Sequence, residues 1–338
     1  MKIKIGIVGY GNIGKGVLKA VEASSDMELV AVFTRRDPGD LVINNGKTVV
    51  YSIDDVCKMV DNIDVMLLCG GSATDLPEQG PYFAGMFNIV DSYDNHAKIP
   101  EYMASIDEVA KNKTAIISTG WDPGVFSLMR VLFESVLPNG MTYTFYGRGV
   151  SQGHSNAIRK IKGVKDAVQY TVPIESAVNE VRAGTTREME PRQRMMRECY
   201  VVVEDDADTA EIEKTIKAMP NYFADYNTTV TFITEQELKE SHSAMPHGGM
   251  VLRSGYTGKS NAEENCTEKY NTNKNSHVME YSLKLESNPE FTASIMVAYA
   301  RAVYRLAKEK NFGAKTVFDV PLTYLSEKDR NTLIKELL

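Results

Sequence analysis

The fold class is decided near the N-terminus by one stretch, Gly9-Tyr10-Gly11-Asn12-Ile13-Gly14. An apolar, β-prone run at Lys4–Val8 precedes it, residues Asn12–Ala23 follow with helical spacing, and Glu28–Phe33 is apolar again. A GxGxxG sequence between a strand and a helix is typical of dinucleotide-binding βαβ units, where the glycines allow a tight turn, approach of the pyrophosphate and close helix–strand packing. A plain glycine turn is the alternative, but the order strand, turn, helix, strand favours dinucleotide binding.

Strands and helices of similar size continue to alternate up to about residue 120. The expected strands are Val65–Cys69, Phe87–Val90 and Ala115–Ser118, and the expected helices are Asp54–Val60, Pro77–Met86 and Pro100–Lys111. Such alternation predicts a parallel sheet with helices on both faces. We therefore expect the α/β fold class, with a Rossmann-type dinucleotide-binding domain at residues 1–120.

The sequence pattern changes after Gly120, where the β-prone runs become longer. This change predicts a mixed α+β domain with a large sheet at residues 121–291. Its expected strands are Thr142–Tyr146, Ala167–Val172, Cys199–Val203, Thr228–Ile233 and Met279–Leu285, and its expected helices are Glu175–Arg182 and Thr209–Met219. The long helix Phe291–Lys310 is apolar enough to pack back on the first domain, so residues 292 to about 325 are assigned there. The polar stretch Gly258–Ser276 is typical of an exposed loop.

The end of the second expected strand indicates which dinucleotide binds. Sites that prefer NAD usually have Asp or Glu there, which binds the ribose 2′-hydroxyl. This chain has Thr34-Arg35-Arg36 instead, and guanidinium groups form charge-assisted, bidentate hydrogen bonds with phosphate. A solvated basic turn is the alternative, but the position beside the adenosine ribose favours NADP.

Composition and charge exclude several classes of protein. The 338 residues carry 38 Lys+Arg against 45 Asp+Glu, a net charge of −7, which argues against nucleic acid or anionic lipid as the main partner. No apolar run approaches the roughly 20 residues of a membrane span, and the strand pattern begins too early for a signal peptide. The four cysteines form no CxxC pair and the five histidines no HxxxH or HxH pattern, so we expect no metal site. A cytoplasmic protein is expected.

Six further segments carry a resemblance to a known family. They are Cys69-Gly70-Gly71-Ser72-Ala73-Thr74-Asp75, Asp91-Ser92-Tyr93-Asp94-Asn95-His96, Ser118-Thr119-Gly120-Trp121-Asp122-Pro123-Gly124, Ser151-Gln152-Gly153-His154-Ser155, Met245-Pro246-His247-Gly248-Gly249 and Asn288-Pro289-Glu290-Phe291-Thr292-Ala293-Ser294. In this order and spacing the chain closely resembles the NADP-dependent meso-diaminopimelate D-dehydrogenases, from the first strand to the long C-terminal helix.

The resemblance implies a reaction and an assembly. Members of the family transfer a hydride from the D-configured α-carbon of meso-2,6-diaminopimelate to NADP, in bacterial lysine biosynthesis. The imine is hydrolysed to L-2-amino-6-oxopimelate, which cyclises to tetrahydrodipicolinate, and ammonia is released. The implied fold is a Rossmann domain completed by the C-terminal segment, with substrate and dimerisation regions, in a homodimer.

Two aspartates are the candidates for the catalytic end of the site. Asp94 and Asp122 follow two expected parallel strands at the edge where open α/β sheets bind ligands. The resemblance implies that they hold the amino group of the D-centre. Asp-Asn and Asp-Pro are also common turn sequences, so a turn or capping role is the alternative.

The resemblance also implies residues for the rest of the substrate. The distal L-centre is assigned to Thr171, Arg197, His247 and Asn288. Arg197 can clamp a carboxylate with two parallel bonds, although an exposed strand arginine and a satisfied loop histidine are the alternatives for Arg197 and His247. The turn at the reacting end comprises Gln152, Gly153, His154, Ser155 and Asn156, and the pocket walls are Trp121, alternatively a core aromatic, and Tyr146.

Three features depart from the family pattern. Asn156 stands where the family often has Asp, Tyr146 stands where several members have Trp, and the stretch Gly258–Ser276 is longer than usual.

The resemblance carries over the remaining pattern, including the cofactor-binding residues, which are Gly9, Tyr10, Gly11, Asn12, Ile13, Gly14, Thr34, Arg35, Arg36, Cys69, Gly70, Gly71, Ser72, Ala73, Thr74, Ser92, Tyr93, Asp94, Thr119, Gly120, Trp121, Asp122 and Pro123. Cys69 suits a small residue against the cofactor better than a redox centre, because no resolving thiol is near it in sequence.

Two other functions compete with this interpretation. One is an NADP-linked oxidoreductase with an aldehyde or keto substrate, and the other is a catalytically silent NADP sensor. A sensor has no need of Asp94, Asp122 and Arg197 together, so their joint presence favours the enzyme.

Overall fold

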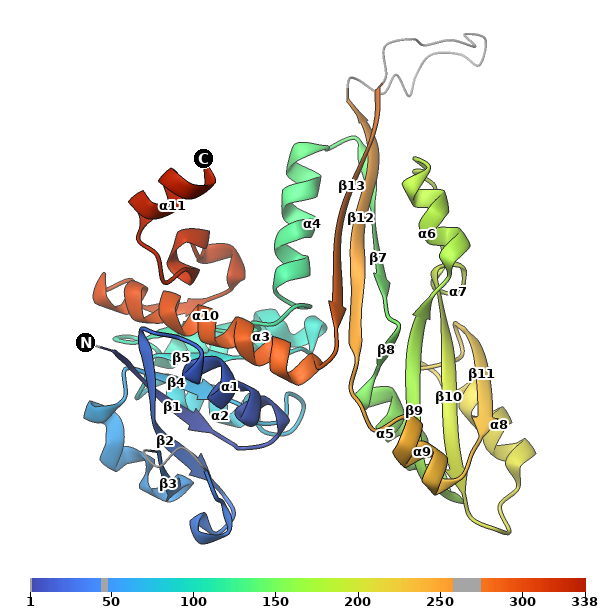
Figure 1. Ribbon diagram of the computed structural model, residues 1–338, viewed down its shortest axis with the longest axis horizontal. Coiled ribbons are helices and arrows are strands. Elements are labelled where there is room, and N and C mark those ends of the chain that lie inside the picture. The colour runs from blue at the N-terminus through green and yellow to red at the C-terminus, as the bar shows by residue number, and fades with distance from the viewer. Residues whose placement is uncertain (1, 44–47, 258–274) are drawn as a thin grey trace. The chain divides into compact units, whose positions relative to one another are not determined.

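The computed structural model describes residues 2–43, 48–257 and 275–338. The chain forms two compact units (Figure 1), unit 1 from residues 1–128 and 289–338, and unit 2 from residues 129–288. Each unit has its own sheets and is described by itself.

Unit 1 is built on a parallel seven-stranded sheet. Its strands are β1 (Ile3–Val8), β2 (Met27–Thr34), β3 (Val49–Ser52), β4 (Val65–Leu68), β5 (Ile89–Asp91), β6 (Thr114–Ile116) and β14 (Gly313–Lys315). Their order in the sheet is β14-β6-β5-β4-β1-β2-β3. The order changes direction beside β1, which has β2 on one side and β4 on the other, and ligands of such sheets bind at this switch point.

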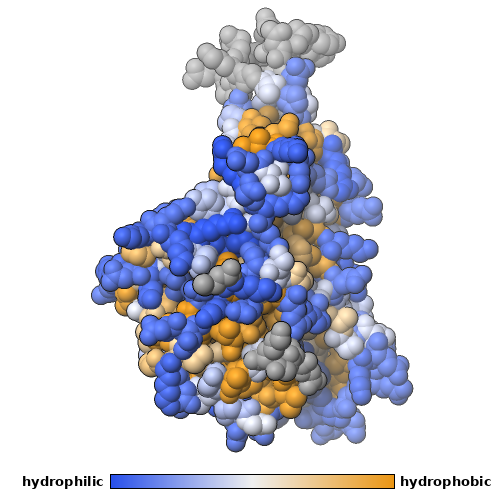
Figure 2. All heavy atoms as spheres, turned by 60° about the vertical axis from the view of Figure 1, so that its left-hand side comes forward, coloured by the Kyte–Doolittle hydropathy of each residue, from blue (hydrophilic) through white to orange (hydrophobic). Residues whose placement is uncertain are grey.

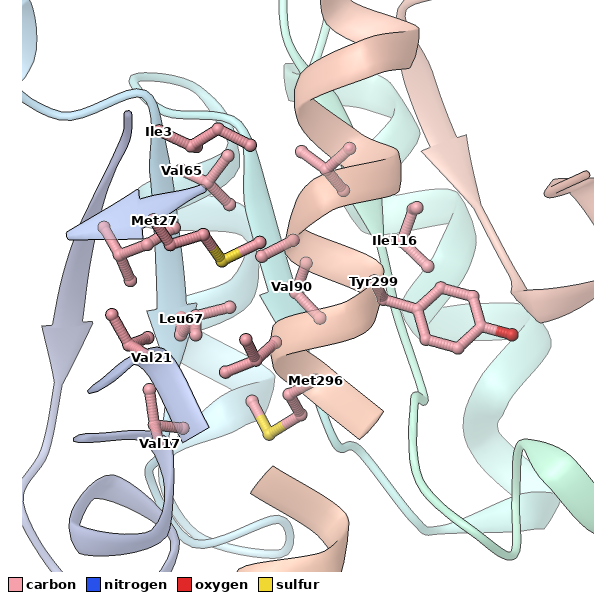
Figure 3. Close-up of a cluster of buried hydrophobic side chains, with 14 of the residues drawn as sticks. Ile3, Val17, Val21, Met27, Val65, Leu67, Val90, Ile116, Met296 and Tyr299 are labelled. Atoms are coloured by element: carbon pink, nitrogen blue, oxygen red, sulfur yellow. The ribbon is translucent and has the colours of Figure 1, made fainter. Parts of the chain in front are cut away.

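Helices cover both faces of this sheet. Those packed on it are α1 (Asn12–Glu22) and α10 (Asn288–Lys308) in one buried cluster, and α2 (Leu76–Ala84) and α3 (Ile99–Val109) in another. Helix α11 (Arg330–Leu337) has no buried residue. The 3₁₀ helices of the unit are η1 (Pro38–Asp40), η2 (Ile53–Asn62), η3 (His96–Lys98), η4 (Val317–Asp319) and η5 (Leu322–Leu325). The expected helix at Asp54–Val60 is therefore a 3₁₀ helix. The expected packing of the long C-terminal helix on the first domain is confirmed, because α10 and α1 share one buried cluster with the strands, with Val17, Met296 and Tyr299 among its members (Figure 3). Helices α2 and α3 contribute Phe83 and Ile106 to a second cluster with other side chains of the sheet.

Unit 2 contains two smaller sheets rather than the single large one expected. Its strands are β7 (Gly140–Tyr146), β8 (Gly149–Val150), β9 (Val164–Pro173), β10 (Met195–Val203), β11 (Asn227–Phe232), β12 (His247–Thr257) and β13 (Asn275–Leu285). One sheet has the order β11-β10-β9-β8 and the other the order β13-β12-β7. Gly147, with a φ of +110°, lies between β7 and β8, so the chain passes from one sheet to the other at this glycine.

The helices of unit 2 lie beside these sheets, and the first of them begins in unit 1. They are α4 (Val125–Val136), α5 (Gln152–Arg159), α6 (Glu175–Arg182), α7 (Pro191–Arg194), α8 (Thr209–Ala218) and α9 (Glu235–Ser241). The segment expected to be a turn, Gln152 to Ser155, is the first turn of α5. Most of the expected loop Gly258–Ser276, residues 258–274, lies outside the described residues. Its last two residues, Asn275 and Ser276, belong to β13.

Figure 2 shows hydrophilic residues over much of one face, interrupted by hydrophobic residues in its lower part. Within the described residues, no helix is long and apolar enough to cross a membrane.

Candidate functional site

The glycine turn of unit 1 has the geometry that a dinucleotide requires. Gly9 has a φ of +89°, in the left-handed region, and a Cβ at Gly14 would collide with the carbonyl oxygen of Gly9. At Gly11, the residue before α1, a Cβ would meet nothing within 4 Å, and the first turn of α1 contains no acidic residue. The first-turn amides have no acceptor inside the helix, so this N-terminus suits a pyrophosphate.

The basic residues after β2 lie beside this turn, because β1 and β2 are paired. The buried Thr34 accepts a hydrogen bond from the amide of Arg36 at 3.1 Å. The Arg35 guanidinium lies 2.9 Å from Asp75 in the loop after β4, and its side chain is 66% exposed. Arg35 is therefore held across the adenosine end of the expected cofactor site without being buried.

The loop after β4 joins the turn to the strands that follow. A Cβ at Gly9 would lie 3.4 Å from the backbone of Cys69, and Ser72 accepts a hydrogen bond from the amide of Asp94 at 2.9 Å. Burial raises the pKa of the Cys69 thiol. The thiol is thus neutral at pH 7, which disfavours thiolate chemistry.

The two candidate aspartates of unit 1 follow neighbouring strands. Strands β5 and β6 are paired in parallel, so Asp94 and Asp122 leave the sheet at the same edge. Asp94 is exposed and Asp122 half-buried. Trp121 is 7% exposed and packs edge-to-face on Phe126 at 5.2 Å between ring centroids, so it contributes to the core of unit 1 at the base of this loop.

In unit 2, Arg197 is a buried cation to which none of the residues described in the structure offers a carboxylate. It faces Thr171 across the β9–β10 pair, and its Nη1 donates a hydrogen bond to the threonine hydroxyl. The guanidinium carbon lies 3.9 Å from the ring centroid of Tyr226. Arg197 is only 6% exposed, its Nε has no hydrogen-bond partner among the described residues, and none of them forms an ion pair with it. Burial lowers the pKa of Arg197, although the guanidinium remains charged at pH 7.

His247 and Asn288 are connected to the same sheet through backbone contacts. Gly149 pairs with Thr171, and a Cβ at Gly149 would lie 2.5 Å from the His247 ring. The amide of Asn288 donates to the carbonyl of Met245 at 3.1 Å, so the four residues assigned to the distal centre are linked within unit 2.

Nδ1 of His247 lies close to the backbone of the next residue. The Gly248 amide nitrogen is 2.8 Å from Nδ1 and the Gly248 carbonyl oxygen is 3.1 Å from it, so Nδ1 accepts from the amide in one tautomer and donates to the carbonyl in the other. Burial lowers the pKa of His247, so the ring is neutral at pH 7.

The first turn of α5 carries the residues expected at the reacting end. Gln152 and Gly153 are exposed there, whereas Ser155 is fully buried. The Ser155 hydroxyl donates to the Ser151 carbonyl at 2.7 Å and accepts from the Gln169 amide at 3.0 Å. The observed contacts of Ser155 therefore fasten α5 to β9.

His154 and Asn156 of the same helix have different partners. Burial, with the charge of Arg197, lowers the pKa of His154 to about 4, so its ring is neutral at pH 7. Nδ1 of His154 lies 2.6 Å from the Ser151 hydroxyl. Asn156 accepts a hydrogen bond from Arg159 at 2.7 Å.

Tyr146, the other expected pocket wall, ends β7, and its hydroxyl lies 3.4 Å from Nη2 of Arg130. Two residues of these clusters were absent from the sequence prediction. Tyr226 stacks on Arg197 from the segment before β11, and nothing in its local sequence indicates this contact. Asp91 accepts hydrogen bonds from the amides of Tyr93 and Ser118 and was assigned no role, although its position as a polar residue ending an apolar run was a signal in the sequence.

Comparisons with known proteins agree over the whole length of the chain. The model of the diaminopimelic acid dehydrogenase C-terminal domain matches residues 120–287. The meso-diaminopimelate D-dehydrogenase of Ureibacillus thermosphaericus is 56% identical, covering 100% of this chain and 99% of that protein. A solved structure of a six-substitution variant of the Clostridium tetani E88 enzyme with diaminopimelate is 52% identical, with a TM-score of 0.91 and 100% of both chains covered. An engineered D-amino acid dehydrogenase bound to NADP⁺ is 40% identical, with a TM-score of 0.83 and 100% of both chains covered.

Proposed function

Because the chain belongs to the meso-diaminopimelate D-dehydrogenase family, we propose that it catalyses the reversible, NADP-dependent oxidative deamination of meso-2,6-diaminopimelate at the D-centre. The products are ammonia and L-2-amino-6-oxopimelate, which cyclises to tetrahydrodipicolinate. The reaction serves bacterial lysine biosynthesis.

The buried Arg197, to which no described residue offers a carboxylate, is the observation that carries this proposal. A buried charge without a counter-charge is unfavourable, so an anionic group of the ligand completes the site. The carboxylate of the L-centre supplies that anion and can accept two parallel hydrogen bonds from the guanidinium. Thr171 and His247 supply further hydrogen-bonding groups for the same end of the substrate.

The substituted positions of the C. tetani variant support the same set of residues. At the first five substituted positions the original residues are Gln, Thr, Arg, Pro and His, and successive positions are 19, 26, 49 and 1 residues apart in the sequence. This chain has the same residue types at the same separations in Gln152, Thr171, Arg197, Pro246 and His247. We therefore add Pro246 to the substrate site.

The residues of unit 1 fit the cofactor and the reacting end. The amides after Gly11 hold the pyrophosphate, and Arg35 and Arg36 hold the 2′-phosphate. Bound NADP supplies the acceptor for the hydride. Asp94 and Asp122 attract the ammonium group of the D-centre, and this fixes which α-carbon is presented for oxidation.

We also propose that the enzyme is a homodimer. Helix α4 exposes Val131, Leu132 and Val136, with exposures of 48%, 48% and 61%, and such apolar patches are typical of subunit interfaces. Light scattering of the protein as it elutes from a size-exclusion column measures its molecular mass in solution. A monomer at micromolar concentration would contradict the homodimer.

Stereochemistry provides the test of the activity. NADPH formation and ammonia release are measured with enantiopure meso, LL and DD isomers at saturating NADP. We expect turnover of the meso isomer with equal yields of NADPH and ammonia, and little turnover of the LL isomer, whose near centre has the wrong configuration. Comparable turnover of the LL and meso isomers, or none with the meso isomer, would overturn the proposal.

A further inference from the structure

A buried carboxylate lies beneath the two loops that carry the candidate aspartates. Asp91, the last residue of β5, is completely buried. Its Oδ1 accepts hydrogen bonds from the amides of Tyr93 at 3.0 Å and Ser118 at 2.9 Å, and its Oδ2 accepts one from the Tyr102 hydroxyl at 2.7 Å. One side chain therefore joins β5, the loop after β6 and helix α3.

The backbone of Asp91 strengthens the same connection. Its carbonyl accepts hydrogen bonds from the amide of Thr119 at 2.9 Å and from the hydroxyl of Thr119 at 2.8 Å. Tyr93 directly precedes Asp94, and Ser118 and Thr119 lie just before Asp122. Ser118 has a φ of +56°, a conformation unfavourable for a serine, and the bond from its amide to Asp91 helps to hold it.

The Tyr102 hydroxyl, the third donor to the Asp91 carboxylate, is itself fixed in place. The Tyr102 ring stacks on Tyr93 with 4.2 Å between centroids, and a Cβ at Gly80 would collide with the Tyr102 hydroxyl. Burial, the charge of Asp91 and the bond to it raise the pKa of Tyr102, so the hydroxyl keeps its proton and donates it.

We propose that Asp91 is a positioning residue that fixes the separation of Asp94 and Asp122 and thereby builds the site for the substrate ammonium group. The inference rests on the proposed function for the roles of those two aspartates. Displacement of a reacting group by about 1 Å costs about 100-fold in rate, so the precision of this junction matters for turnover.

Three substitutions separate positioning from general stability. Asp91→Ala removes all three side-chain bonds. Asp91→Asn keeps an oxygen for the two amides, while its NH₂ group can donate to the Tyr102 oxygen. Thr114→Val is the matched control, because it removes the hydrogen bond from the buried Thr114 hydroxyl to the Asn311 carbonyl at the opposite end of β6.

We expect kcat/KM for meso-diaminopimelate to fall about 100-fold in Asp91→Ala, with the Kd of NADP changed less than about threefold. Asp91→Asn should retain kcat/KM within about threefold, because it preserves the acceptor for both amides. Thr114→Val should lower the Tm and leave kcat/KM at the wild-type value. A folded Asp91→Ala with wild-type kcat/KM, or a Thr114→Val with an equal loss, would overturn the proposal.

Hydrogen exchange provides a readout that needs no substrate. Peptides covering residues 92–95 and 118–122 should exchange faster in Asp91→Ala than in wild type, but not in Thr114→Val. If Asp91→Ala does not fold, Tyr102→Phe replaces it, with a loss of about tenfold in kcat/KM and faster exchange in the same peptides. Unchanged exchange in both peptides would overturn the positioning role, whereas a wild type that exchanges as expected but does not oxidise meso-diaminopimelate would overturn only the proposed function.

Discussion

Replacing Arg197 by methionine should separate substrate binding from the stability of the fold. The side chain is 6% exposed, and no described residue supplies a carboxylate. In the complex its loss leaves the substrate carboxylate buried and unpaired, which costs about 2–5 kcal/mol. At about 1.4 kcal/mol per tenfold, kcat/KM for meso-diaminopimelate should fall by a factor between about 30 and several thousand.

The fold should not weaken to the same extent. Exchange of a buried charged group for an apolar side chain of similar size is often neutral, or stabilising by about 1–4 kcal/mol. Arg197 also loses its contact with the Tyr226 ring, which is worth about 0.5–2 kcal/mol. These contributions oppose each other, and the hydrogen bond to Thr171 is lost as well, so the Tm should change little.

Arg148→Met is the matched control for this experiment. The Arg148 guanidinium also lies over a tyrosine, 4.5 Å from the Tyr170 centroid, but it forms an ion pair with Glu198. Its loss should leave kcat/KM within about threefold, because a half-exposed ion pair contributes about 1 kcal/mol or less. The assays are initial rates of NADPH formation, NADP binding by fluorescence and thermal unfolding. An unchanged kcat/KM in Arg197→Met, or an equal loss in Arg148→Met, would refute the assignment of Arg197 to the distal clamp.

Two other predictions concern the cofactor and pH. The double substitution of Arg35 and Arg36 by alanine should raise the KM of NADP at least about tenfold, because each charged hydrogen bond is worth about 1.5–3 kcal/mol, and should leave the KM of NAD nearly unchanged. An unaltered KM for NADP would remove both arginines from the 2′-phosphate site. The pKa of His154 is about 4 in the folded chain and 6.5 in its unperturbed state, so between these values the unfolded chain binds the additional proton and the free energy of unfolding should fall as the pH falls. Denaturant titrations at several pH values should show a shallower slope in His154→Gln, and an identical slope would contradict the buried, neutral ring.

Local patterns in the sequence were sufficient for five strands of the parallel sheet of unit 1, whereas the edge strands β3 and β14 were missed. The glycine turn and the apolar runs of β1, β2 and β4 are each encoded by a short stretch of consecutive residues, so a local pattern is enough to predict them. Strand β12 was missed because Gly248, Gly249 and Gly255 weaken its strand pattern, although pairing with β7 and β13 holds it at the centre of a sheet.

The contacts of the candidate site depend more strongly on long-range pairing. Thr171 and Arg197 become neighbours only through the register of β9 against β10, which residue composition does not determine. The role inferred for Asp91 depends likewise on β5 lying beside β6. Motif resemblance could identify the assigned residues but gave no indication of Tyr226, whose contact requires the folded unit.

The fate of the D-centre hydrogen tests the central claim most directly. Meso-diaminopimelate labelled with deuterium at the D α-carbon is compared with the same compound labelled at the L α-carbon, and the reduced cofactor is analysed by mass spectrometry. The D-labelled substrate should yield NADPH that carries the deuterium, and the L-labelled substrate should yield unlabelled NADPH. Deuterium recovered in NADPH from the L-labelled substrate would contradict the proposed oxidation of the D-centre.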